Sequence, residues 1–314
     1  LGSNRMQFSV HNNEQPMGDE QITGQSGSEK HAYLIMAHNE FGLLRKLIQL
    51  LDDERNDIYV HVDQKAAGFD IRKFQDLPRL SRIIFVARKS VSWGAYSQID
   101  CELSLLKEAA RHDHGYYHLL SGADMPLKSQ DTIHQFFEQH SGSEFISFHE
   151  GSMHRKVFRD RIQLYHFFQE IIGHSRKQDL LFYLNQMSLK VQETLRVNRI
   201  KDSPLDFRKG TTWFSISHDL ASYLISQEAS IRKTYRLTQC ADEIFLHTAA
   251  WNSRFKEKIV NQSLRVIDWK RGRPYIFRYE DYELLFSSGA FWARKFSEKI
   301  DQAIIEKIYH SLQG

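Results

Sequence analysis

The sequence predicts an α/β fold in which a mostly parallel central sheet carries helices on both faces. Two observations support this prediction. From residue 31 onward, short apolar runs such as HAYLIMA alternate with amphipathic helical patterns such as GLLRKLIQLLDD. No internal repeat or low-complexity tract interrupts this alternation, so the chain reads as one domain rather than an array. Alternating strands and helices are typical of parallel sheets, whose ligands lie beyond the carboxyl ends of the strands.

Each element of the first half follows from one such run. The expected elements are a strand at 31–37, a helix at 42–53, strands at 57–63 and 82–87, a helix at 97–112, a strand at 116–120, a helix near 130–139 and a strand at 144–148. We therefore expect residues 31–150 to form the first part of the sheet.

The amino-acid composition changes at the start of the second half of the chain. Residues 151–205 are rich in Arg, Lys, His, Phe and Leu at helical spacing, which predicts a helical insert. The elements expected after it are a strand at 213–217, helices near 218–237 and 241–252, a strand-rich patch at 264–269 and 274–278, and two closing helices. Residues 31–314 are thus expected to form a single domain. Residues 1–30 are polar and read as a leader that is disordered or introduced by cloning.

Composition and charge exclude several classes of protein. The formal net charge of +3 is too small for a general nucleic-acid binder, but it suits anionic small substrates or an anionic membrane surface. No apolar run approaches the ~18 residues of a membrane span. Cys101 and Cys240 are far apart and form neither a disulfide framework nor a zinc motif, so a reducing cytoplasm is expected. Phosphate-binding glycine loops, the HExxH metal motif and the GxSxG nucleophile motif do not occur.

Two polar groups follow predicted strands. Asp63 ends the HVD triplet after the strand at 57–63, and Asp124 lies in Ser-Gly-Ala-Asp-Met-Pro after the strand at 116–120. A carboxylate at such a strand end can bind a base or a ribose. Taken alone, however, each is more typical of a helix cap or an ordinary turn.

A second set of polar groups lies toward the C-terminus. Glu243 opens an apolar helix in ADEIFLHT, where a partly buried glutamate could act as a general base, although acids also favour helix starts for electrostatic reasons. Arg278 and Lys295 could hold a diphosphate, although a solvated basic face is the commoner role of any one such cation. Trp269 and Tyr275 offer aromatic surface on which a sugar could stack.

The motifs in their order resemble the core-2/I-branching β-1,6-N-acetylglucosaminyltransferases and their xylosyltransferase relatives. The resemblance runs from about Ala32 to Asp301, and it rests on AYLIMAHNE, HVDQK, VARKSVSWGAYSQID, LLSGADMPL, KGTTWFSISHDLASYL, ADEIFLHT and, more loosely, FWARKFSEKID. It implies a GT-A type nucleotide-sugar transferase fold and an inverting transfer from a UDP-sugar to a glycan hydroxyl.

The resemblance also implies roles for individual residues. Glu243 is the expected catalytic base, and no metal or other cofactor is expected, because no D-x-D triplet ends a strand and basic residues take the place of a cation. The expected nucleotide-sugar contacts are Asp63, Trp93, Tyr96, Asp124, Arg278 and Lys295, and the expected acceptor contacts are Glu150, Arg155, Arg159 and Trp269, with Arg161 as a further candidate. Residues 31–150 would then bind the nucleotide, and residues 206–314 would form the catalytic and acceptor half.

The identity of the donor sugar stays open at this point. N-acetylglucosamine is the favoured donor, while the His-Thr after IFL resembles the xylosyltransferase branch and keeps UDP-xylose or another UDP-sugar as an alternative. A catalytically silent glycan- or nucleotide-binding module is a third hypothesis. With neither the membrane anchor nor the disulfides of the animal enzymes, the chain resembles a bacterial-type member. Such a member is expected in the cytoplasm, acting on an oligosaccharide or lipid-linked glycan, with the basic insert in peripheral contact with the inner face of a membrane.

Overall fold

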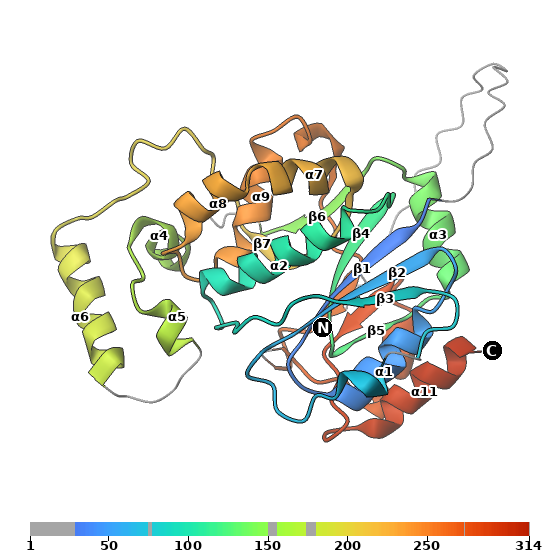
Figure 1. Ribbon diagram of the computed structural model, residues 1–314. Coiled ribbons are helices and arrows are strands. Elements are labelled where there is room, and N and C mark those ends of the chain that lie inside the picture. Colours follow the sequence, from blue (N-terminus) through green and yellow to red (C-terminus); the bar gives the residue numbers. More distant parts are fainter. Residues whose placement is uncertain (1–28, 75–76, 150–155, 174–179, 273, 314) are drawn as a thin grey trace, which may run out of the picture.

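The computed structural model describes most of the chain. The described residues are 29–74, 77–149, 156–173, 180–272 and 274–313. A seven-stranded sheet runs through the centre of the molecule in the order β3-β2-β1-β4-β7-β6-β8 (Figure 1). Its strands are β1 (His31–Ala37), β2 (Asn56–Val62), β3 (Arg82–Phe85), β4 (Tyr116–Ser121), β6 (Glu144–Phe148), β7 (Gly210–Ser217) and β8 (Ile259–Val260).

The direction of each strand determines which strand ends lie together at each edge of this sheet. β1 pairs in parallel with β2 and β4, and β2 pairs in parallel with β3. β7 runs antiparallel to β4, with Tyr116 opposite Ser217 and His118 opposite Ser215. The first residues of β7 therefore lie at the edge where β1, β2 and β4 end.

Helices cover both faces of the sheet. β1 alternates across it, because Ala32 and Leu34 pack into one core while Tyr33 and Ile35 pack into the other. The first core is closed by α2 (Tyr96–Ala109), α7 (His218–Ser226), α8 (Glu228–Tyr235) and α9 (Phe245–Trp251), and the second by α1 (Phe41–Leu50) and α3 (Gln130–Gln139). Burial on both faces explains why β1 is apolar at almost every position. The predicted α/β class with a mostly parallel central sheet is confirmed.

A small second sheet lies against the first. It has the order β5-β10-β9, from β5 (Asp124–Pro126), β10 (Trp292–Arg294) and β9 (Arg265–Ile267). With α10 (Tyr282–Phe286) and α11 (Gln302–Gln313) it encloses a third apolar core. The strand expected at 274–278 is wrong: this segment runs outside both sheets, and the Phe277 N–H bonds the Lys295 carbonyl just beyond the end of β10.

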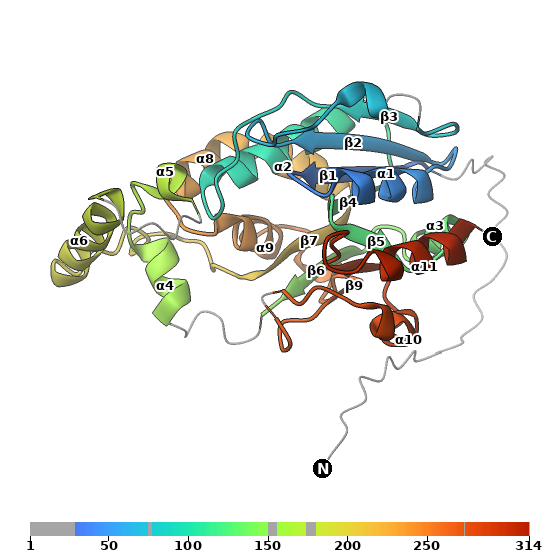
Figure 2. The same cartoon turned by 90° about the horizontal axis from the view of Figure 1, so that it is seen from below.

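The predicted helical insert forms α4 (Lys156–Gln163), α5 (Gln169–Ile172) and α6 (Leu180–Thr194), which project from the end of the molecule opposite α11 (Figures 1 and 2). The Gln192 side chain fixes α6 by bonding both the N–H and the carbonyl of Tyr165, at 2.7 and 3.0 Å. Single turns of 3₁₀ helix complete the described secondary structure: η1 (Ile71–Lys73), η3 (Ala241–Glu243), η4 (Lys256–Lys258) and η5 (Tyr279–Asp281). None of the described helices combines the length and apolar character needed to cross a bilayer.

Candidate active site

The carboxyl ends of three parallel strands gather polar groups at one edge of the central sheet. The Asp63 N–H, just past β2, donates to the Ala37 carbonyl at the end of β1 over 2.9 Å. On the other side of β1, the Gly122 N–H donates to the Met36 carbonyl over 2.9 Å. Asp63 and the turn that carries Asp124 therefore flank the end of β1, where ligands of such sheets bind.

Trp93 belongs to the neighbourhood of Asp63. The Gln64 N–H bonds the Lys89 carbonyl at 2.9 Å, and the Lys65 ammonium bonds the Val91 carbonyl at 2.6 Å, so the segment before Trp93 runs beside the segment after Asp63. Trp93 is 51% exposed. The two predicted nucleoside contacts thus lie on adjacent segments.

Tyr96 is placed differently. It begins α2 and is buried in the core that α2 shares with α8, where the Arg232 guanidinium lies 5.7 Å from its ring centre. Burial raises the pKa of Tyr96 to about 12. Its role in nucleotide binding stays a prediction.

Asp124 anchors a cation that the sequence analysis did not single out. Its buried carboxylate accepts hydrogen bonds from the Ser121 N–H and hydroxyl and forms an ion pair with Arg294 at 3.0 Å. The Arg294 guanidinium also lies over the Trp213 ring, 4.4 Å from its centre. Arg294 faces Asp124 in the β5–β10 register, which places Lys295 immediately past this pair.

The corner around Lys295 is electrostatically positive. Burial, followed by the charge of Arg294, lowers the pKa of Lys295. Burial, followed by the charges of Lys295 and Arg294, also lowers the pKa of His38, the first residue after β1. The two shifts show that positive charge is costly in this corner, so an anion bound there would relieve the cost.

Glu243 is held by two cations. Its carboxylate accepts from Arg161 of α4 at 2.8 Å and from Lys209, just before β7, at 2.9 Å. The preceding residue, Asp242, is buried, and its carboxylate accepts from the Thr212 hydroxyl at 2.9 Å. The predicted base therefore lies at the start of β7, and a residue of the insert contacts it.

The first residues of β7 join the predicted base to the predicted diphosphate site. Thr212 binds Asp242, the neighbour of Glu243, and the next residue, Trp213, lies beneath Arg294, the neighbour of Lys295. Consecutive Cα atoms are ~3.8 Å apart. Successive side chains of a strand point to opposite faces of the sheet, so the acid and the cations lie on either side of the beginning of β7.

Arg278 and Trp269 lie next to the same corner. The Phe277 N–H donates to the Lys295 carbonyl at 2.9 Å, so Arg278 follows directly, but its guanidinium donates to the Ile300 carbonyl at 3.0 Å. Trp269 follows the end of β9, where Ile267 pairs with Arg294, and its side chain is 58% exposed. Both residues remain predicted ligand contacts.

Two of the other predicted acceptor contacts lie on α4. Arg159 is exposed on α4, whereas Arg161 on the same helix reaches Glu243. Glu150 and Arg155 lie outside the described residues.

Three residues of the site that were not predicted individually lie in motifs of the sequence. Arg294 lies within FWARKF, Lys209 opens KGTTW and His38 lies in AHNE, all of them motifs that support the family resemblance. A short motif indicates which segment matters, but not which of its side chains faces the ligand.

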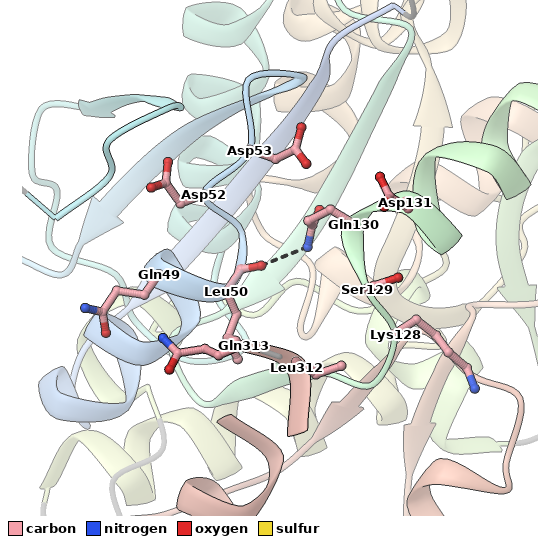
Figure 3. Close-up of a pocket in the computed structure, with 10 residues that line it drawn as sticks. All are labelled: Gln49, Leu50, Asp52, Asp53, Lys128, Ser129, Gln130, Asp131, Leu312 and Gln313. Carbon is pink, nitrogen blue, oxygen red and sulfur yellow. Dashed lines mark hydrogen bonds between the residues drawn. The ribbon is translucent and has the colours of Figure 1, made fainter. Parts of the chain in front are cut away.

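Two hollows in the described part of the chain lie away from this site. One, of about 310 Å³, is lined by the end of α1, the start of α3 and the end of α11, including Asp53, Gln130 and Gln313 (Figure 3). The other, of about 510 Å³, includes Gly115 before β4 and Ser217 at the end of β7. Both open at the edge where the parallel strands begin, opposite Asp63. Within the described ranges no group of three or more His, Cys, Asp or Glu side chains is arranged to hold a metal ion.

Comparisons with known proteins find xylosyltransferases among the relatives of this chain. The chain is similar to xylosyltransferase sqv-6 of Caenorhabditis briggsae, with 24% identity over 79% of this chain and 32% of the relative. It is also similar to a xylosyltransferase of Ciona intestinalis, with 23% identity over 90% of this chain and 34% of the relative. The chain therefore spans about a third of the length of these curated relatives.

One solved structure and one family model complete the comparison. The crystal structure of mouse xyloside xylosyltransferase 1 in its apo form overlaps with 84% of this chain and 96% of its own, at 10% identity and a TM-score of 0.38. That overlap is too low to establish a common fold. The family model described as Core-2/I-Branching enzyme matches residues 31–285, well over half of the sequence. The chain therefore belongs to the Core-2/I-branching enzyme family of glycosyltransferases.

Proposed function

We propose that this chain has a GT-A type fold and transfers a sugar from a UDP-sugar to a glycan hydroxyl, with inversion and without a metal ion. The observation that carries the proposal is the pair of contacts made by Thr212 and Trp213. They bring the acidic turn of Glu243 and the cationic pair Arg294–Lys295 to the beginning of one strand. An inverting transfer requires an acid–base group on one side of the sugar and charge stabilisation on the other.

Each group has a definite task in this reaction. The Glu243 carboxylate takes the proton of the acceptor hydroxyl as its oxygen bonds to the anomeric carbon from the face opposite UDP. The bond between that carbon and the diphosphate oxygen breaks, and the negative charge passes to UDP. Lys295 and Arg294, with Arg278 beside them, receive this charge. A charge pair ~4 Å apart at an effective dielectric constant of about 20 contributes roughly 4 kcal/mol.

The donor is proposed at the level of UDP-sugars. N-acetylglucosamine is the donor that the sequence resemblance favours, whereas the names of the curated relatives favour UDP-xylose. Thermal shift and hydrolysis with UDP-N-acetylglucosamine, UDP-xylose, UDP-glucose and UDP-galactose decide between them. A sugar that stabilises the protein and is hydrolysed fastest is the donor. Binding of UDP with no turnover on any donor or acceptor would favour the silent binding module.

The decisive variant is Glu243→Gln, which keeps the size of the side chain and removes its basic oxygen. We expect it to fold, to bind UDP with a Kd within twofold of the wild type, and to lose kcat by ~10²–10⁴-fold. The matched control is Glu257→Gln, an exposed residue of η4 outside the site, which should keep full activity. Transfer by the Glu243 variant at the wild-type rate would remove this residue from its role.

The acceptor and the location are also proposals. We propose an oligosaccharide or lipid-linked glycan acceptor, handled in the cytoplasm at the inner face of a membrane. Support comes from α6, where Leu180, Tyr183, Met187 and Val191 follow one side of the helix and are each more than half exposed. Apolar side chains on a peripheral helix can enter a lipid surface. Co-sedimentation with anionic but not with zwitterionic vesicles is the expected result, and recovery only in the supernatant would contradict it.

A further inference from the structure

Three carboxyl oxygens behind Glu243 are buried without a hydrogen-bond partner. Glu102 of α2 is 0% exposed, and within the described part of the chain neither of its carboxyl oxygens has a partner. The same holds for Oδ1 of Asp242 on the turn that carries Glu243. A buried polar atom without a partner costs several kcal/mol, so such a cluster requires an explanation.

The hydrogen bonds of Asp242 bring its turn to the face of α2 that carries Glu102. Gln98 and Glu102 lie one helical turn apart on the same face of α2. The Gln98 amide donates to Oδ2 of Asp242 at 3.3 Å, and the Thr212 hydroxyl donates to the same oxygen at 2.9 Å. Both hydrogen bonds therefore end on Oδ2, and Oδ1 is free to accept from a neighbour of Gln98 on α2.

The electrostatics agree with this contact. Burial, followed by the charge of Asp242, raises the pKa of Glu102 well above its ordinary range. Burial, followed by the charge of Glu243, raises the pKa of Asp242 to about 6. Two carboxyl groups in one buried site cannot both ionise, because the second charge would have neither water nor a cation to offset it.

We propose that Glu102 is a positioning residue that stays protonated and donates a hydrogen bond to Asp242, and that this pair fixes the turn bearing Glu243. The inference rests on the proposed function of Glu243. A hydrogen bond from a carboxyl to a carboxylate is short and charge-assisted. This hydrogen bond gives each acid a partner. It would fix η3 to α2, while the Thr212 hydroxyl fixes η3 to β7 of the sheet.

The charged groups near the pair belong to the site or to its own elements. The titratable groups around it are Glu243 on the same turn, Arg161 from α4, Lys209 before β7, and the buried thiols of Cys101 on α2 and Cys240 before η3. Arg161 and Lys209 are bound to Glu243. The proton on Glu102 is therefore the donor that the geometry leaves for Oδ1.

Three variants test the proposal in the full chain. Glu102→Gln keeps a neutral donor of the same size, and Glu102→Leu removes the donor at similar volume. Leu103→Ala, a buried neighbour on α2, is the control for loss of core packing. We expect the Gln variant to keep at least half of kcat. The Leu variant should lose at least tenfold in kcat with less than twofold change in the donor KM, and the acid limb of its pH profile should move upward.

Each alternative gives a different result. If Glu102 is only part of the core, the Leu variant will resemble Leu103→Ala, with a lower Tm and an unchanged pH profile, and the proposal fails. If the Gln variant is as inactive as the Leu variant, Glu102 is ionised and the proposal also fails.

An infrared measurement locates the proton without any transfer assay. The stretching band of a protonated carboxyl should appear in the wild type at pH 7.5 and decrease in Glu102→Gln. Identical spectra of the wild type and Glu102→Gln would show that Glu102 is not protonated, and the proposal would fail. Should the wild type transfer no sugar at all, the proposed function fails, whereas the band alone still decides the state of Glu102.

Discussion

Three buried histidines should make the free energy of unfolding depend on pH. The rings of His31 and His134 stack with their centres 4.0 Å apart, and Nδ1 of His31 lies 3.1 Å from Nε2 of His118. Burial, followed by the charge of Arg55, lowers the pKa of His134 to about 4. Burial also lowers the pKa of His31 and of His118 well below its ordinary range. The folded protein therefore holds these rings neutral.

The sign and size of the effect follow from linkage. An unfolded chain protonates histidine near pH 6.5, whereas folded His134 stays neutral down to about pH 4. Between these values the unfolded state binds the extra proton, so stability is complete above pH 6.5 and falls as the pH falls. At pH 5 the difference spans about 1.5 pH units, which corresponds to about 2 kcal/mol for His134 alone.

His134→Gln isolates this contribution. The glutamine amide can still donate to Asn56, whose side-chain oxygen lies 2.8 Å from His134 Nε2, but it cannot titrate. Urea unfolding at pH 7, 6 and 5 should show that the variant loses about 2 kcal/mol less than the wild type across this range. His310→Gln, at an exposed position of α11, is the control and should leave the slope unchanged. Curves that stay parallel within 0.5 kcal/mol, on the order of the ~10% error of such extrapolations, would refute the reasoning.

Three further results follow from the site. Arg294→Met should weaken UDP binding about tenfold in calorimetry, because a charge-assisted contact contributes ~1.5–3 kcal/mol; an unchanged Kd would exclude Arg294 from the site. Gly210→Ala should destabilise the fold by ~1–3 kcal/mol, since a Cβ would collide with the Ser147 carbonyl and the His247 ring; an unaltered Tm would contradict this contact. Treatment with EDTA should leave the initial transfer rate within twofold, and inactivation that Mn²⁺ reverses would show that a metal is needed.

Long or strongly periodic elements were predictable from the sequence alone. The helix expected near 130–139 is α3 (Gln130–Gln139), and the strand expected at 57–63 is β2 (Asn56–Val62). The helix expected at 42–53 ends at Leu50, because the Asp52 carboxylate instead binds the N–H groups of the loop at 79–81. Local pattern was sufficient wherever burial on one or two faces determined the residue types.

Short elements were not predictable, because their partners are distant in the sequence. β5 and β10 have three residues each, and they pair across about 170 positions. A strand of only three residues is too short to show a periodic pattern, so the sequence does not indicate which distant strand it pairs with. The Arg294–Asp124 contact depends on this pairing, so the sequence directed attention to Lys295 instead. The proximity of Glu243 and Arg161 was hidden for the same reason, since the two residues are 82 positions apart.

The reversed direction of β7 has a consequence for how such enzymes could diversify. Because this strand starts at the edge where β1, β2 and β4 end, the chain segment leading into it, which contains α4 to α6, reaches Glu243 through Arg161. Under the proposed function, replacing or resizing this helical insert would present a new surface to the acceptor and leave the strands of the nucleotide-binding edge unchanged. Loops on other α/β folds vary specificity in the same way.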